Sequence, residues 1–167
     1  TPALAVKQCV NITNEMAGLS VENLKNSISL INNFDFKTYD KILNTEEKVD
    51  KYEDMLGTYI IKLSSQKMTD RDSELTTEIL KAIGDFERIS DHAVNISKSA
   101  LEMNDKKLSF SESAMKELTQ LCGAVNEITE ITFSSFINSD VKKAKNVEPL
   151  EQVIDELKET VRNRHIK

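Results

Sequence analysis

Apolar residues recur at helical spacing along almost the whole chain, and no stretch alternates with the period of two that marks a strand. The pattern predicts five helices, at about residues 3–31, 36–63, 72–103, 112–136 and 147–167. Polar stretches separate them, and Thr69 or Asp70 and Ser109 or Ser111 are the expected N-caps of the third and fourth helices. The second helix is the most regular, with one apolar residue every seven positions: Ile42, Val49, Leu56 and Leu63.

Long helices joined by short polar turns run antiparallel and bury their apolar stripes against each other. The expected fold is therefore all-α. Residues 1–104 would form an antiparallel, up-down three-helix bundle, and residues 105–167 would supply the first two helices of a second, incomplete bundle. Because the chain begins at "TPALAV" without a methionine, we expect it to be a segment of a longer protein.

An internal repeat supports the second bundle. The stretch "EEKVDKYEDMLGTYIIK" from Glu46 aligns with "EQVIDELKETVRNRHIK" from Glu151, so that Asp50 meets Asp155. The last helix is thus a second copy of the helix at 36–63. A copy of the helix at 72–103 should come next, and the sequence stops before it. This shortage leaves the last two helices without a third partner.

Composition and charge exclude several classes of protein. The 167 residues carry a net charge of −6, which argues against nucleic-acid binding because phosphate contacts need clustered Lys and Arg. No run of eighteen apolar residues exists, so we expect no membrane insertion of this segment. The two cysteines, Cys9 and Cys122, lie far apart in apolar helical surroundings, as expected of small core residues carrying free thiols.

Three Glu-x-x-x-Asp pairs, Glu46/Asp50, Glu87/Asp91 and Glu151/Asp155, are the candidate chemistry of the chain. Residues four apart lie one above the other on a helix, so each pair presents two carboxylates on one face. Like charges at that spacing destabilise a helix by about 0.2–0.5 kcal/mol. A bound cation would offset that cost.

If the first two pairs face each other on adjacent helices, four carboxylates converge. An oxygen-only set of ligands suits a hard divalent or trivalent cation, including iron. The alternative is that the pairs are solvated flanks, because acidic pairs arise often in a helical chain that is 30% charged. His92 follows Asp91 directly, but neighbouring helical residues point about 100° apart, which favours a flank residue over a nitrogen ligand.

Catalytic motifs are absent from the sequence. It contains no nucleophile elbow, P-loop, Gly-rich dinucleotide turn or His-Glu-x-x-His motif. The Glu-x-x-His pairing of carboxylate-bridged di-iron bundles is also missing, which disfavours an oxygen-activating enzyme. We therefore predict a protein that is not an enzyme.

Three segments, "EEKVDKYEDML", "FERISDHAVNI" and "VEPLEQVIDELK", resemble the PhoU domain family, whose members carry Glu/Asp-x-x-x-Asp motifs on paired three-helix bundles. Two further segments, "PALAVKQCVNITNEMAGLSVENLKNSI" and "VDKYEDMLGTYIIKLSS", look most like the PhoU-like C-terminal region of bacterial sodium/phosphate cotransporters. The likeness covers nearly the whole chain. One departure is Ser90, where a glycine is usual before "DHA".

The resemblance implies a regulatory domain of a sodium-dependent phosphate transporter that takes part in the control of phosphate uptake. It would lie at the cytoplasmic face of the bacterial membrane, with the transmembrane part of the same protein as its partner. Iron or zinc would bind at the motif positions Glu46, Asp50, Glu87 and Asp91. Glu151 and Asp155 would form a second, incomplete site. The alternative is a metal-free helical module that forms dimers or binds other proteins through the incomplete second bundle.

Overall fold

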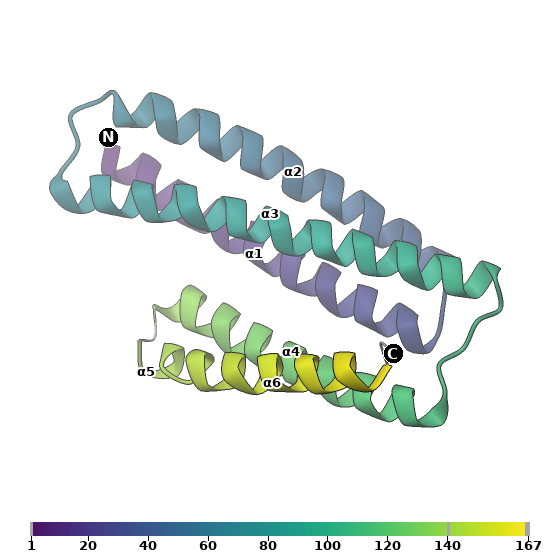
Figure 1. Cartoon of the computed structure of the whole chain (residues 1–167). Helices are drawn as coiled ribbons and strands as arrows, with labels where there is room; N and C mark the ends of the chain where they lie inside the picture. Colours follow the sequence, from purple (N-terminus) through teal and green to yellow (C-terminus); the bar gives the residue numbers. More distant parts are fainter. Residues whose placement is uncertain (1, 140, 166–167) are drawn as a thin grey trace. The chain divides into compact units, whose positions relative to one another are not determined.

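The computed structural model describes residues 2–139 and 141–165, which form helices and no strand (Figure 1). The helices are α1 (Pro2–Asn32), α2 (Phe36–Ser64), α3 (Asp70–Asp105), α4 (Glu112–Asn138), α5 (Val141–Ala144) and α6 (Val147–His165). The predicted all-α fold is confirmed, and the ends of the five predicted helices that can be compared lie within two residues of the observed ends. The prediction for residues 166–167 lies outside the described residues, and the short α5 was not predicted.

Side chains at the helix starts explain where three of the helices begin. The Asp35 carboxylate accepts hydrogen bonds from the backbone N–H groups of Lys37 and Thr38, which starts α2. The Thr69 hydroxyl accepts from the backbone N–H of Asp72, and the Ser111 hydroxyl accepts from that of Ala114. Each bond satisfies one backbone donor that has no partner inside the helix. Thr69 and Ser111 are two of the predicted caps.

The chain divides into two compact units, which we call unit 1 (residues 1–101) and unit 2 (residues 102–167). In unit 1, α2 runs antiparallel to α1 and to most of α3, so that the three helices form an up-down-up bundle (Figure 1). Its core is mainly aliphatic, and the predicted heptad of α2 is completely buried. At the end near the α1–α2 loop, Leu30 and Ile42 pack with small α3 residues and with Phe34 and Tyr39.

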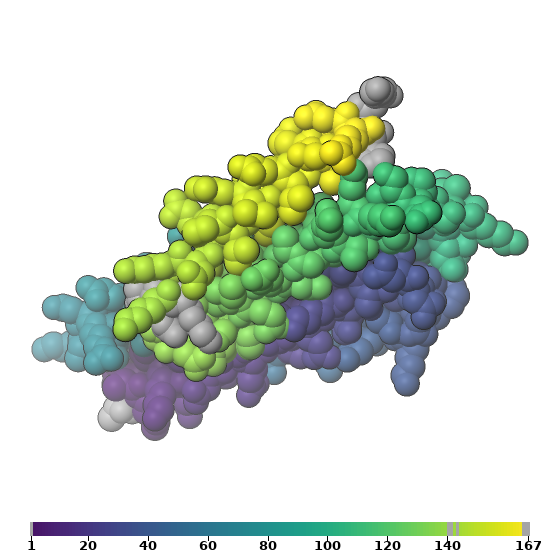
Figure 2. All heavy atoms as spheres, turned by 90° about the horizontal axis from the view of Figure 1, so that it is seen from below, coloured from purple at the N-terminus to yellow at the C-terminus, as the bar shows by residue number. Residues whose placement is uncertain are grey.

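Unit 2 is built mainly from the antiparallel helices α4 and α6, which lie side by side in both overall views (Figures 1 and 2). Arg164 near the end of α6 pairs with Glu117 near the start of α4. Among the described residues of unit 2, Ser135 alone is buried, and the apolar residues of both helices are half-buried or exposed. None of the described helices combines the length and apolar character needed to cross a membrane.

Candidate cation site

The structure brings two of the three predicted acidic pairs together on one face of unit 1. Glu46 and Asp50 project from α2, and Glu87 and Asp91 project from α3. Glu46 and Glu87 are half-buried, while Asp50 and Asp91 are exposed. The charge of Asp91 acts on Glu46 and that of Asp50 acts on Glu87, so the two pairs influence each other across the helix interface. We call this group the acidic face.

Glu87 is the most strongly perturbed carboxyl group of the acidic face. Its pKa is raised from 4.5 to about 6, first by partial burial and then by the charges of Asp91 and Glu53. A hydrogen bond with Asp91 and the charge of Asp50 act in the same direction. Glu87 is therefore the group that most readily takes up a proton when no cation is present.

Glu46 occupies a similar position on α2. Partial burial raises the pKa of its carboxyl group, and the charges of Asp91, Asp50 and Glu47 raise it further. Lys98 on α3 is the one contributor that lowers the pKa of Glu46. This lysine offsets only part of the negative charge on the acidic face, so the carboxylates still repel one another.

Glu53 is a fifth carboxylate of the acidic face that the sequence analysis did not single out. Partial burial raises its pKa, followed by the charges of Asp50, Asp54 and Asp91. Its Oε1 atom lies 3.8 Å from the position that a Cβ would occupy at Gly84, so the carboxylate rests against the backbone of α3. Positions 46, 50 and 53 share one helical face, and that spacing could have revealed Glu53.

The chemistry of this donor set matches a hard cation, because all five side chains supply carboxylate oxygen. The distances between these side chains are, however, too large for three of them to coordinate one ion directly. Among the described residues, no three acidic, thiol or imidazole side chains are gathered closely enough to hold a metal ion. The acidic face thus has the right donors in one place, but side-chain rotation would be needed to close them around an ion.

The third predicted pair has different surroundings. Glu151 and Asp155 lie on α6 and are both exposed. The Nζ atom of Lys158 is 2.9 Å from Oδ1 of Asp155, and this contact raises the pKa of Lys158. The pair in unit 2 is therefore compensated by a lysine of its own helix, unlike its repeat equivalent, Glu46/Asp50.

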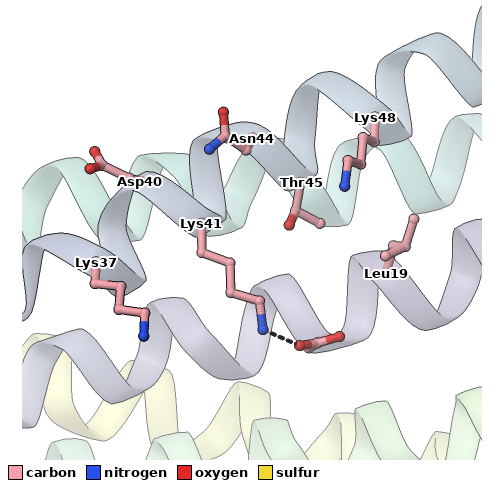
Figure 3. Close-up of a pocket in the computed structure, with 8 residues that line it drawn as sticks. Leu19, Lys37, Asp40, Lys41, Asn44, Thr45 and Lys48 are labelled. Carbon is pink, nitrogen blue, oxygen red and sulfur yellow. Dashed lines mark hydrogen bonds and ion pairs between the residues drawn. The ribbon is translucent and has the colours of Figure 1, made fainter.

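A surface groove of about 670 Å³ lies between α1 and the first half of α2 (Figure 3). Three lysines line it, namely Lys37, Lys41 and Lys48. Glu22 and Asp40 line it too, and the Nζ atom of Lys41 is 2.5 Å from Oε1 of Glu22. Because the opposite charges nearly balance, the groove has no strong preference for an anion or a cation.

Comparison with known proteins identifies a family for most of unit 1. A profile of the PhoU domain family, described as "PhoU domain", matches residues 13–100, which is most of unit 1. Solved structures give no significant match to the chain.

Three relatives are named as phosphate-specific transport system accessory proteins of the PhoU type. The Thermotoga maritima PhoU homolog 1 is 32% identical over 84 residues, which are 50% of this chain and 35% of that protein. The Xylella fastidiosa (Temecula1) homolog is 24% identical over 132 residues, or 79% of this chain and 54% of that protein. The Deinococcus radiodurans homolog is 24% identical over 125 residues, or 72% and 56%. The chain thus spans between about a third and just over half of each relative.

Proposed function

The chain belongs to the PhoU domain family, and on that premise we propose that it is a regulatory, non-enzymatic domain that acts in the control of phosphate uptake. The observation that carries the proposal is the family match across the three helices that present the acidic face. Relatives that align with most of this chain are named as accessory proteins of a phosphate-specific transport system.

The finer proposal is that the chain is the cytoplasmic domain of a sodium-dependent phosphate transporter of the bacterial cell membrane. Its support is the resemblance of "PALAVKQCVNITNEMAGLSVENLKNSI" and "VDKYEDMLGTYIIKLSS" to the C-terminal region of such transporters. Its partner would then be the transmembrane part of the same protein.

We further propose that Glu46, Asp50, Glu87 and Asp91 hold a divalent or trivalent cation, with iron or zinc as the preferred ions. The support is the mutual effect of their charges across the α2–α3 interface. A cation would remove the repulsion that raises the pKa of Glu87, and it would draw the carboxylates of both helices inward. The surface offered to the transporter would change with it.

Titration calorimetry of Fe²⁺, Zn²⁺, Mn²⁺ and Mg²⁺ into metal-free protein tests the cation site. We expect binding in the wild type and a loss of at least tenfold in affinity for the double variant Glu87→Gln/Asp91→Asn. The matched control is Glu151→Gln/Asp155→Asn, which removes an equally spaced pair on α6 and should leave the affinity unchanged. Equal binding by the wild type and both variants would remove the cation from the proposal.

The regulatory proposal is tested in cells that carry the full-length protein. Uptake of radioactive phosphate should change when the segment 1–167 is deleted and the rest of the protein is retained. The transporter should still be present at its normal level, which an immunoblot of the membrane fraction checks. Unchanged uptake at high and low external phosphate would contradict the proposal.

Unit 2 favours a second candidate function, a metal-free module that forms dimers. The helices α4 and α6 bury scarcely any side chain among the described residues, so their apolar residues remain available for a second copy. Light scattering should then give twice the mass of the 18.9 kDa chain. A mass of 18.9 kDa at every protein concentration measured would exclude this function.

A further inference from the structure

Asn23 is a fully buried polar side chain in the second half of α1. Its Nδ2 atom donates a hydrogen bond of 3.1 Å to the backbone carbonyl oxygen of Ile42 on α2. The same atom donates a second bond of 3.1 Å to Oγ of Ser90 on α3. One amide group thus joins all three helices of unit 1. Ser90 is completely buried and supplies one of the two acceptors.

The orientation of the amide follows from hydrogen-bond chemistry. A backbone carbonyl oxygen can only accept, so the NH₂ group of Asn23 and not its oxygen must face Ile42. Both amide hydrogens are used in the two bonds. The Oδ1 atom is buried without a hydrogen-bond partner. A buried acceptor without a partner lowers stability, so the Asn23 side chain carries a cost that its two donated hydrogen bonds offset.

Buried asparagines of this kind have a known physical effect in helical bundles, where they fix one axial register at some cost in stability. The apolar positions of α2 repeat every seven residues, which by itself permits neighbouring helices to slip. A slip of α3 by one turn, about 5.4 Å, would place Phe86 or Val94 where Ser90 now lies. Neither side chain can accept the hydrogen bond from Asn23.

The two acceptors lie directly beside the acidic face. Glu46 follows Ile42 by one helical turn, and Asp91 is the residue after Ser90. We propose that Asn23 sets the axial register of α2 against α3 and thereby holds Glu46 opposite Asp91, as a positioning residue of the acidic face. The proposal rests on the proposed cation site for its functional meaning, whereas the register itself can be measured without a cation.

The register is tested by electron-resonance distance measurements in the full chain. Both native cysteines are replaced (Cys9→Ala, Cys122→Ala), and spin labels are attached at the exposed positions Lys51 on α2 and Asn95 on α3. We expect one narrow distance distribution with Asn23 present. In Asn23→Leu, which is apolar and similar in size, we expect a second population displaced by about one turn, 5 Å.

Two further variants make this measurement decisive. Thr13→Val is the matched control, because Thr13 is also a buried polar residue of α1 but bonds only to the carbonyl oxygen of Cys9 in its own helix. It should leave the distances unchanged. Ser90→Ala removes one acceptor without changing α1, and it replaces Asn23→Leu if that variant does not fold. If the distances are unchanged in Asn23→Leu and in Ser90→Ala, or in whichever of the two folds, the proposal is overturned.

Calorimetry with Mn²⁺ separates a positioning role from a merely structural one. Asn23→Leu should bind Mn²⁺ about tenfold more weakly than the wild type. Losses of this size are typical when a residue that positions metal-binding side chains, without contacting the metal itself, is replaced. Thr13→Val should bind as the wild type does. A displaced register with unchanged Mn²⁺ affinity would overturn the positioning role. If the wild type binds no cation, the proposed cation site fails, and the distance measurement alone decides whether Asn23 sets the register.

Discussion

Units 1 and 2 carry the same acidic motif in different surroundings. In unit 1, the apolar stripe beside the motif is completely buried, with Val49 at 0% exposure and Leu56 at 2%. In unit 2, the stripe beside the repeated motif is only half-buried, at Ile154 and Leu157. The motif of unit 1 faces a third helix that carries more carboxylates, whereas Asp155 in unit 2 contacts Lys158 of its own helix.

The difference shows that a carboxylate pair on one helix does not by itself determine the electrostatics of a site. Glu46 and Glu87 acquire raised pKa values because both are partly buried and because α2 and α3 place like charges opposite each other. The α4–α6 pair has no such third helix among the described residues of unit 2. The same Glu-x-x-x-Asp motif therefore forms part of a cluster of mutually repelling carboxylates in unit 1 and a solvent-exposed pair in unit 2.

Matched core truncations provide the largest expected contrast. Leu56→Ala removes a buried side chain of α2 and should lower the free energy of unfolding by about 2–5 kcal/mol. Leu157→Ala removes a half-buried side chain of α6 and should cost about 1 kcal/mol or less. Urea unfolding followed by circular dichroism measures both. Equal losses for the two variants would show that unit 2 is packed as well as unit 1, which breaks the comparison.

Helix caps should have intermediate effects that are similar in both units. Thr69→Ala removes the cap of α3, and Ser111→Ala removes the cap of α4. Each substitution should cost about 1 kcal/mol, because one backbone N–H loses its hydrogen bond. Thermal and urea unfolding of the two variants give the values. A cost near zero for Ser111→Ala alone would mean that α4 contributes little to the stability measured.

The pH dependence of stability should come from unit 1 and should be the smallest of these effects. Because the folded pKa of Glu87 is about 6 and its ordinary value is 4.5, the folded state binds a proton more tightly than the unfolded state. Its contribution is present below about pH 4.5 and is lost as the pH rises through 6. The size should be about 1 kcal/mol or less, since the carboxylate is only partly buried.

Glu87→Gln isolates this effect. The variant should be more stable than the wild type at pH 7 and should lose the part of the pH dependence between pH 4.5 and 6.5. The groups that face Glu87 are Asp91 on its own helix and Asp50 and Glu53 on α2. These three carboxylates are still present in Glu87→Gln, so any pH dependence that they cause is common to both proteins. Glu151→Gln on α6 serves as the control and should leave the pH profile unchanged. Identical profiles for the wild type and Glu87→Gln would contradict the assignment.

The helices were predictable because their apolar spacing is regular and their starts carry Thr69 and Ser111 as caps. The short α5 was not predicted, because four residues of "VKKA" show no periodicity. The antiparallel arrangement of α2 and α3 made it one of two open possibilities that the pairs Glu46/Asp50 and Glu87/Asp91 face each other. Their relative height along the bundle could not be inferred, because no pattern of apolar residues fixes the register.

Glu53 could have been predicted from the sequence, whereas the hydrogen-bond partners of Asn23 could not. Glu53 was overlooked although its spacing from Asp50 places it on the same face, so the sequence did contain a signal. Asn23 reads as an isolated polar residue in "LSVENLKNSI", and nothing in the sequence names Ile42 and Ser90 as its partners. Long-range hydrogen bonds of this kind depend on how three helices pack, which local spacing does not encode.

A crystal structure of the Mn²⁺-soaked protein, with anomalous data collected near the manganese absorption edge, tests the central claim most directly. The proposed cation site predicts an anomalous peak between α2 and α3, within about 2.0–2.4 Å of carboxylate oxygens of Glu46, Asp50, Glu87 or Asp91. It predicts no peak of comparable height beside Glu151 and Asp155. An acidic face without manganese at saturating concentration, or a stronger peak on α6, would contradict it.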